Sequence, residues 1–202
     1  MIATLVVVAA ALLMVRLGFW QLERRHEKEA LLAHYAANVA TSPAALVALW
    51  PVHESDLFRR VSAHCLTVVG WQAEAGRNRA GGSGWRHIAS CSTGAEGPGF
   101  VVDMGISQSS ASPGWKGGDV RGRLIWAPTG QPLVARLISA PVAPTPMIVS
   151  ETAAPGLQPT ADPDPASIPN NHLSYAVQWF LFAGIALVIY AIALWQRARK
   201  KA

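Results

Sequence analysis

An uncharged stretch near the C-terminal end, residues 175–195, constrains this chain more than any other feature. It holds 21 residues without a formal charge. As a helix it would be roughly 31 Å long, about the hydrocarbon thickness of a bilayer. Polar side chains crowd its beginning from residue 170, whereas its far end runs into basic residues. The pattern predicts a transmembrane helix over residues 172–196 and a basic cytoplasmic tail over residues 197–202.

The composition agrees with a membrane protein. Hydrophobic residues make up 51% of the chain and charged residues only 14%, whereas a soluble domain is about a quarter charged. The net charge is +5, but four of the basic residues lie in the last six positions, where they flank the predicted span. Because no basic stripe is interleaved with aromatic residues, we expect membrane lipid as a partner and no nucleic acid.

A second apolar run opens the sequence. Residues 2–15 are apolar, and the run reaches Leu22 if Arg16 directs its charge toward the headgroups. We expect a first transmembrane helix over residues 1–22, with Trp20 in the interfacial aromatic belt. A cleaved signal peptide is the alternative, disfavoured because no basic segment precedes the run and no clear cleavage site follows it. A start at a span, without a transit peptide, favours a bacterial plasma membrane over a mitochondrion.

The orientation of the two spans rests on their basic flanks. The C-terminal basic cluster places both termini in the cytoplasm and the central domain outside. The basic residues at 24, 25 and 28 favour the opposite orientation. A long loop is translocated largely regardless of its charge, so the compact C-terminal cluster carries more weight.

The central region changes character twice. Residues 23–50 predict juxtamembrane helices, the second one starting at Ser42-Pro43 and ending at Leu49. Residues 51–152 predict a mainly β domain, a sandwich or a barrel, because short β-favouring runs alternate there with Gly, Pro and Ser. The expected strands lie at 59–71, 85–92, 99–107, 119–127, 131–139 and 145–150. A proline-rich connector, residues 153–171, then leads back to the membrane. The predicted fold is two transmembrane helices flanking a mainly β (α+β) extracytoplasmic domain.

The two cysteines, Cys65 and Cys91, leave their state open. In an exported domain they can form a disulfide, and two buried free thiols fit the sequence equally well. A metal site that combines these cysteines with His64 and His87 is disfavoured. His64 and Cys65 are adjacent, and adjacent residues on a strand point to opposite faces, so both could not simply bind one ion. Asp103 is the only acid in an apolar run, where we expect a hydrogen-bonding residue at a strand end.

Segments at both ends of the chain resemble the surfeit locus protein one family, membrane factors for the assembly of haem–copper cytochrome c oxidase. They are LGFWQLERRHEK (Leu17–Lys28) and NNHLSYAVQWFLFA (Asn170–Ala183). Weaker similarities in the middle are FRRV (Phe58–Val61), Gly70, Asn78-Arg79 and DVRGRL (Asp119–Leu124). Where the family typically has a VDRGW-like segment, this chain has VDMGI (Val102–Ile106), which suggests a diverged partner surface.

The resemblance implies a role in inserting haem a into the catalytic subunit of the oxidase, without catalysis of a reaction. It implies that subunit and haem a synthase as partners, and His172 as a haem a ligand. The residues allow this, because neutral imidazole is a good axial ligand for haem iron. His172, Tyr175 and Trp179, spaced i, i+3, i+7, share one helix face as a cofactor-binding set. The alternative function is a scaffold that binds oxidase subunits without haem.

Other interpretations of these polar residues stay open. His172 can instead cap the helix, and Asn170 or Asn171 is equally well placed to do so. Gln178 lies inside the predicted span, where a buried amide usually contacts another helix, and Gln21 is its expected partner. Trp20 and Trp179 fit the aromatic belt, and Trp20 is a further candidate for contact between the helices. No cluster of serine, histidine and acid suggests hydrolysis.

Overall fold

The computed structural model describes residues 2–94, 97–128 and 143–200, and its contacts divide the chain into two units. One unit joins residues 1–33 to residues 167–202, and the other is His34–Ala166. The first unit contains two long apolar helices and the second a mixed β-sheet, so the predicted fold class is confirmed.

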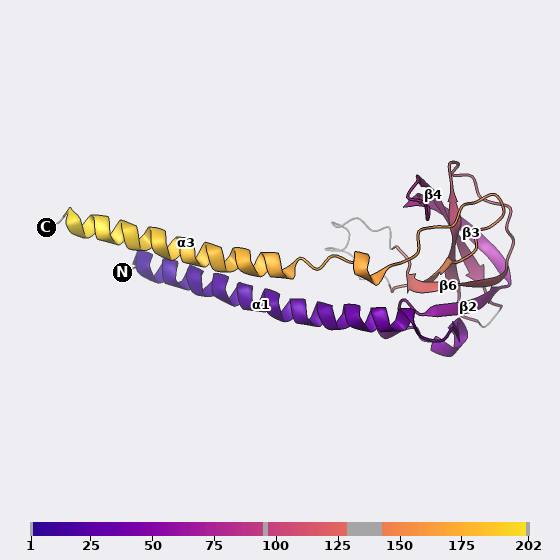
Figure 1. The fold of residues 1–202 in the computed structure, drawn as a ribbon, viewed down its shortest axis with the longest axis horizontal. Coiled ribbons are helices and arrows are strands. Elements are labelled where there is room, and N and C mark those ends of the chain that lie inside the picture. The colour runs from indigo at the N-terminus through magenta and orange to yellow at the C-terminus, as the bar shows by residue number, and fades with distance from the viewer. Residues whose placement is uncertain (1, 95–96, 129–142, 201–202) are drawn as a thin grey trace. The chain divides into compact units, whose positions relative to one another are not determined.

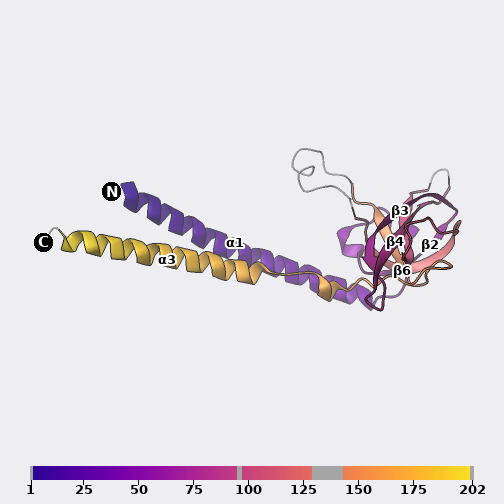
Figure 2. The same ribbon diagram turned by 90° about the horizontal axis from the view of Figure 1, so that it is seen from above.

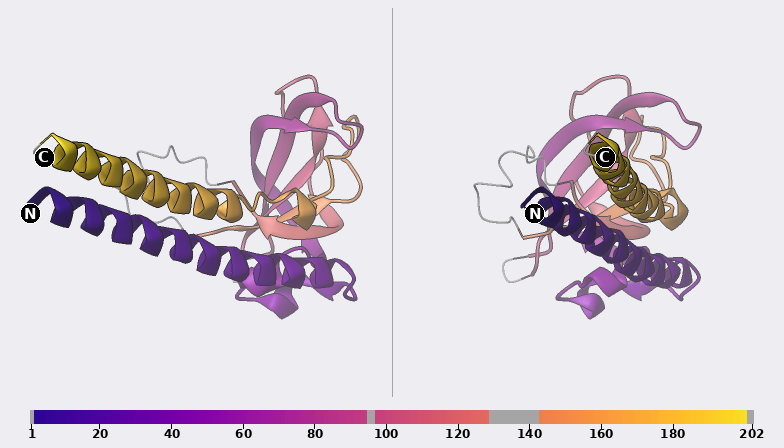
Figure 3. Two further views of the ribbon diagram at one scale, coloured as in Figure 1. Left: turned by 60° about the vertical axis from the view of Figure 1, so that its left-hand side comes forward. Right: turned by 90° about the vertical axis from the view of Figure 1, so that its left-hand side faces the viewer.

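Two helices dominate the first unit. Helix α1 (Ile2–Val39) has 38 residues and helix α3 (His172–Arg199) has 28. They run antiparallel, and both chain ends lie at the same end of the pair (Figures 1 and 3). By length and composition, both helices are able to cross a membrane.

Helix α1 continues without a break past Leu22, the predicted end of the first span. Ion pairs between neighbouring turns support the charged part of the helix. Arg24 Nη1 lies 2.6 Å from Glu27 Oε2, and Arg25 Nε lies 2.7 Å from Glu29 Oε1. Pairs spaced i, i+3 or i, i+4 add a few tenths of a kcal/mol each to a helix. The boundary at residue 22 is therefore a change of composition within one helix.

The second unit is built on one seven-stranded sheet in the order β1-β2-β6-β7-β5-β4-β3. The pairs β1–β2 and β5–β7 are parallel and the other pairs antiparallel. All seven strands belong to one sheet, so a two-sheet sandwich is not present among the described residues. The sheet is strongly curved (Figure 2), and the disulfide between Cys65 and Cys91 joins two of its strands that are not neighbours in the order. The strands are β1 (Ala44–Ala45), β2 (Arg60–Cys65), β3 (Thr67–Arg77), β4 (Ser83–Ser92), β5 (Phe100–Ser107), β6 (Gly118–Trp126) and β7 (Pro146–Ser150).

Strand β7 lies at the centre of the sheet and is buried along its whole length. A strand covered on both faces needs a continuous apolar sequence, which the Met147–Val149 segment supplies. The core around it is formed by side chains from the neighbouring strands, including Phe100, Ile106 and Leu124. The predicted run at 145–150 thus becomes the middle of the domain.

Two elements predicted between residues 42 and 71 differ from those in the structure. The single run 59–71 is two strands, β2 and β3, which separate at the exposed Leu66. The helix predicted from Ser42-Pro43 to Leu49 is only a 3₁₀ turn, Leu46–Leu49, and its N-cap is Ala45 rather than Ser42. Ala44 and Ala45 instead pair in parallel with Val61 and Ser62. Strand pairing there outweighs the local capping signal, which is a weak preference.

The predicted connector, residues 153–171, is largely part of the β domain. Gln158 exchanges both backbone hydrogen bonds with Ile106 at 2.7 and 2.8 Å, and Arg79 donates its backbone N–H to Pro159 at 3.0 Å. Buried backbone groups of the sheet need partners, and this segment supplies them. Only from Ser167 onward does the chain belong to the helix unit. The predicted strand at 131–139 lies outside the described residues.

The VDMGI segment forms a bulge in β5. Met104 and Gly105 together stand opposite His87 on β4, and Gly105 has a φ of +120°. Asp103 Oδ1 accepts hydrogen bonds from the Gly105 N–H at 3.0 Å and the Thr160 hydroxyl at 2.7 Å. Asp103 is therefore a buried residue in mid-strand, not at the strand end that the sequence suggests. Its burial raises the pKa of the Asp103 carboxyl, against the opposing effects of the Thr160 hydrogen bond and of Arg86.

Replacing Gly105 by alanine should destabilise the β domain strongly. The left-handed backbone alone costs a non-glycine residue about 1–3 kcal/mol. An added Cβ would also lie 2.6 Å from the Gln158 carbonyl oxygen. Gly70→Ala is the matched control, because no atom lies within 4 Å of an added Cβ there. Thermal unfolding of the full-length protein in detergent checks this, and equal melting temperatures for the two variants would contradict it.

Candidate functional site

Small residues bring the two helices of the first unit together. Gly18 faces Phe180 so closely that an added Cβ would lie 2.6 Å from its ring. Phe19 meets the same ring edge-on, with centroids 5.3 Å apart, and Ala176 and Ala183 are buried along the seam of α3. Small residues allow transmembrane helices to approach closely and pack without a hydrophobic driving force. This contact sets the register that positions the polar ends of the pair.

His172 is the first residue of α3 and is half-buried. Its Nδ1 lies 2.7 Å from Oε1 of Gln21 on α1. Gln178 is the partner expected for Gln21, whereas in the structure His172 makes this contact. Gln178 is exposed, and the described contact of the Gln21 Oε1 atom is with His172. Gln178 lies two positions beyond the buried Ala176, on a different face of α3.

The start of α3 has no side-chain cap. Asn171 is the N-cap residue, but its side chain makes no capping hydrogen bond. Its backbone carbonyl accepts the Tyr175 N–H at 3.3 Å and the Ser174 hydroxyl at 2.7 Å. The side-chain oxygen of Asn170 is buried without a hydrogen-bond partner. The side chains of Asn170 and Asn171 therefore do not cap α3. The ring of His172 does not cap it either, because it bonds to Gln21 on the other helix.

The aromatic residues near His172 differ in exposure. Tyr175, one turn further along α3, is 52% exposed. Trp179 is half-buried and meets Phe182 edge-on, with centroids 6.3 Å apart. Trp20 on α1 is 42% exposed, and Arg24 stacks over its ring at 5.9 Å. Its described partner is thus a residue of its own helix, and no described bond links Trp20 to α3.

The donor set at this end of the helix pair contains one imidazole, which has the chemistry of an axial haem ligand and is too few ligands for a bare metal ion. Among the described residues, no group of three or more His, Cys, Asp and Glu side chains is placed to hold a metal. Haem iron already has four nitrogen ligands and needs one axial ligand from the protein, which a single imidazole supplies. His172, with the exposed phenol ring of Tyr175 on the same helix, offers that ligand and an aromatic surface.

A second polar group lies in the β domain and contains the histidines and cysteines of the disfavoured metal site. Cys65 and Cys91 are disulfide-bonded, which removes both thiols from any such site. His87 is buried, with its Nε2 2.9 Å from the Ser107 hydroxyl. His64 is exposed, and its Nδ1 lies 2.6 Å from Asp119 Oδ1, its partner in the β2–β6 register.

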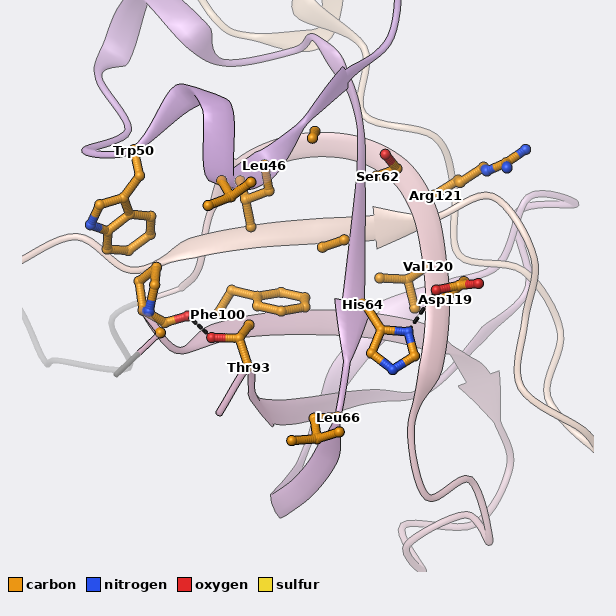
Figure 4. Close-up of a pocket in the computed structure, with 15 residues that line it drawn as sticks. Leu46, Trp50, Ser62, His64, Leu66, Thr93, Phe100, Asp119, Val120 and Arg121 are labelled. Atoms are coloured by element: carbon orange, nitrogen blue, oxygen red, sulfur yellow. Dashed lines mark hydrogen bonds and ion pairs between the residues drawn. The ribbon is translucent and has the colours of Figure 1, made fainter. Parts of the chain in front are cut away.

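The His64–Asp119 pair borders a groove of about 620 Å³ in the β domain. Figure 4 shows the pair on one side of the groove and Trp50 on the other, with Phe100 between them. Val47, Trp50 and Leu66, three large apolar residues that remain exposed in this domain, all line it. Exposed apolar residues gathered in one concave surface often mark an interaction site. No pattern in the sequence indicated this groove, because its walls come from segments far apart in the chain.

Comparison with known proteins agrees with the layout just described. A model of the SURF1 family matches residues 8–184, and this range contains Gln21, His172, Tyr175 and Trp179. No curated protein matches the chain. The family match covers most of α1, the β domain and the first half of α3. The chain therefore belongs to the SURF1 family, a family of cytochrome oxidase assembly factors rather than of enzymes.

Proposed function

We propose that this protein binds haem a at the start of α3 and assists its insertion into the catalytic subunit of cytochrome c oxidase. The observation that carries the proposal is the place of His172, half-buried at the polar end of an apolar helix that is able to cross a membrane. At such a depth an amphiphilic porphyrin can keep its propionates in water and its tail in lipid. Haem a synthase is the proposed donor of the cofactor.

A carrier must release what it binds, and this site suits that requirement. Within the described residues, His172 is the only histidine on α3, so it would be the single axial ligand from that helix. Tyr175 lies one turn further along α3 and is exposed, so a haem bound there would stay accessible from one side. His172 would hold the iron, while the aromatic face of α3 would hold the ring, and neither task requires a reaction on the protein.

The test of this function is an optical spectrum of the detergent-purified protein from cells that make haem a. We expect haem a bands at close to one haem per chain. Protein that purifies without haem, and that takes up none when haem a is added, would refute the proposal. The same preparation should then be assayed for bound oxidase subunits, which the alternative function requires.

The groove of the β domain favours a second function, that of a haem-free scaffold for oxidase subunits. Val47 and Leu66 are 72% and 61% exposed on its rim, where a partner could cover them. Replacing both by serine should weaken co-purification of the catalytic subunit while leaving any haem spectrum unchanged. Unaltered co-purification would remove the groove as an argument for this function.

We further propose that both chain ends are cytoplasmic and the β domain lies outside a bacterial plasma membrane. The disulfide supports this orientation, since such bonds persist in oxidising compartments. A cysteine introduced at the exposed Ser110 would be a unique labelling site, because both native cysteines are bonded to each other. A membrane-impermeant thiol reagent should label Ser110→Cys in intact cells or spheroplasts. Labelling only after the membrane is opened would contradict the orientation.

A further inference from the structure

Among the described contacts of His172, one joins its ring to a polar side chain of the other helix, Gln21. Gln21 lies one turn beyond Gly18 on α1, and His172 lies two turns before Phe180 on α3. The contact between Gly18 and Phe180 therefore fixes the register in which Gln21 meets His172. The contact joins Oε1 of the glutamine to Nδ1 of the imidazole at 2.7 Å.

The chemistry of this contact determines where the imidazole keeps its proton. An amide oxygen has lone pairs and no hydrogen, so it can only accept. The bond to Gln21 therefore requires a proton on Nδ1 of His172. A neutral imidazole carries a single N–H, which leaves the lone pair on Nε2.

We propose that Gln21 is the positioning residue that holds neutral His172 in its Nδ1–H tautomer and directs the Nε2 lone pair toward the haem iron. This inference rests on the proposed haem function. Residues that accept the second N–H of a ligating histidine generally fix its tautomer and ring orientation. Without Gln21, the ring would be free to rotate and to carry its proton on Nε2, which cannot then ligate.

The choice of an amide, rather than a carboxylate, has a consequence for ligand strength. A carboxylate partner raises the basicity of a ligating imidazole, and the neutral amide of Gln21 does so far less. The protein provides the contrast itself, since Asp119 contacts the same ring atom of His64 in the β domain. Gln21 thus orients His172 while keeping it a moderate ligand, which suits a protein that must pass its cofactor on.

Two substitutions separate orientation from ligand strength. Gln21→Met keeps the length of the side chain and removes the acceptor, so the tautomer should become mixed and haem affinity should fall about 10- to 100-fold. Gln21→Glu keeps the acceptor and adds charge, so haem should bind more tightly, dissociate more slowly and show a lower reduction potential. The matched controls are Gln196→Met and Gln196→Glu, at an exposed glutamine on α3 beyond the uncharged stretch, and neither should change these properties.

The first measurement needs no haem. In full-length protein labelled with ¹⁵N-histidine, the two ring nitrogens of His172 report the tautomer directly, with His172→Asn assigning the signals. We expect a protonated Nδ1 in the wild type and a mixture in Gln21→Met. A protonated Nε2 in the wild type, or no change in Gln21→Met, would overturn the inference.

The second measurement uses added ferric haem as the probe and records affinity and reduction potential for the same variants. A potential that falls in Gln21→Glu but not in Gln196→Glu supports the positioning role. Equal potentials in both glutamate variants would count against it. If no variant, including the wild type, binds haem, the proposed function fails, and the nitrogen spectra still decide whether Gln21 sets the tautomer.

Discussion

Protein carrying asparagine in place of His172 should be made and inserted normally but should retain little haem. Asparagine can hydrogen-bond to Gln21 and can cap a helix, so the local structure has a substitute for the ring. It has no aromatic nitrogen with a lone pair, and so it cannot serve as the axial ligand. We expect the haem spectrum of purified His172→Asn to lose most of its intensity, and cells that carry it to contain poorly haemylated oxidase.

The control is the same substitution at a histidine outside the site. His26 lies on α1 with a side chain that is 78% exposed. His26→Asn should therefore leave haem occupancy unchanged. It is a better control than a variant at His87, which is buried and would disturb the β domain. Both variants must be compared at equal protein abundance, and an undiminished spectrum in His172→Asn would favour the scaffold function.

Breaking the disulfide should have the largest effect on the stability of the β domain. Cys65 and Cys91 are separated by 26 positions, and both are buried. In the chain-entropy model, closing a loop of that size contributes about 3 kcal/mol to the free energy of unfolding. The bond also ties the end of β2 to the end of β4, strands that are not neighbours in the sheet. Cys65→Ser/Cys91→Ser should therefore unfold at a clearly lower temperature or urea concentration.

Wild-type protein after reduction is the control that separates the bond from the substitution. It has the same side chains without the cross-link, and so it should unfold close to the double variant. A thiol count on denatured, unreduced protein checks the starting state. We expect no free thiols, and a count of two would show that the bond is absent from the purified protein.

The long apolar helices were predictable because their signal lies along the chain. Whether a segment can cross a bilayer depends on its length and on the absence of charge, and both are read from consecutive residues. The same holds for the helical character of residues 20–39, which lack glycine and proline and carry charge pairs at helical spacing. The mainly β character of the central domain was predictable for a similar reason. Its strands appear in the sequence as short apolar runs separated by turn residues.

The pairing of the strands could not be predicted in the same way. Strand β7 enters the sheet between β5 and β6, next to one parallel and one antiparallel neighbour. The segment around Gln158 looked like a free connector because its contribution is made by backbone atoms, which every sequence has. The structure also gives a physical reason for one middle motif of the resemblance, since an added Cβ at Gly122, in DVRGRL, would overlap the Val149 carbonyl. It likewise shows why VDMGI, the segment that departs from the family pattern, needs Gly105, which has a positive φ in a bulge.

For the candidate site, the sequence by itself determined which residues could take part, and the tertiary structure decided which of them meet. His172 and its helix face follow from the spacing of side chains along one helix. Gln21 and His172 are 151 positions apart, and their contact depends on how Gly18 and Phe180 set the helix register. The sequence likewise allowed Cys65 and Cys91 to be either bonded or free, and the fold decides this by placing their Cα atoms 5.2 Å apart in a disulfide. Local pattern is a one-dimensional property of the chain, whereas a hydrogen bond or a disulfide requires two atoms at one place in three dimensions.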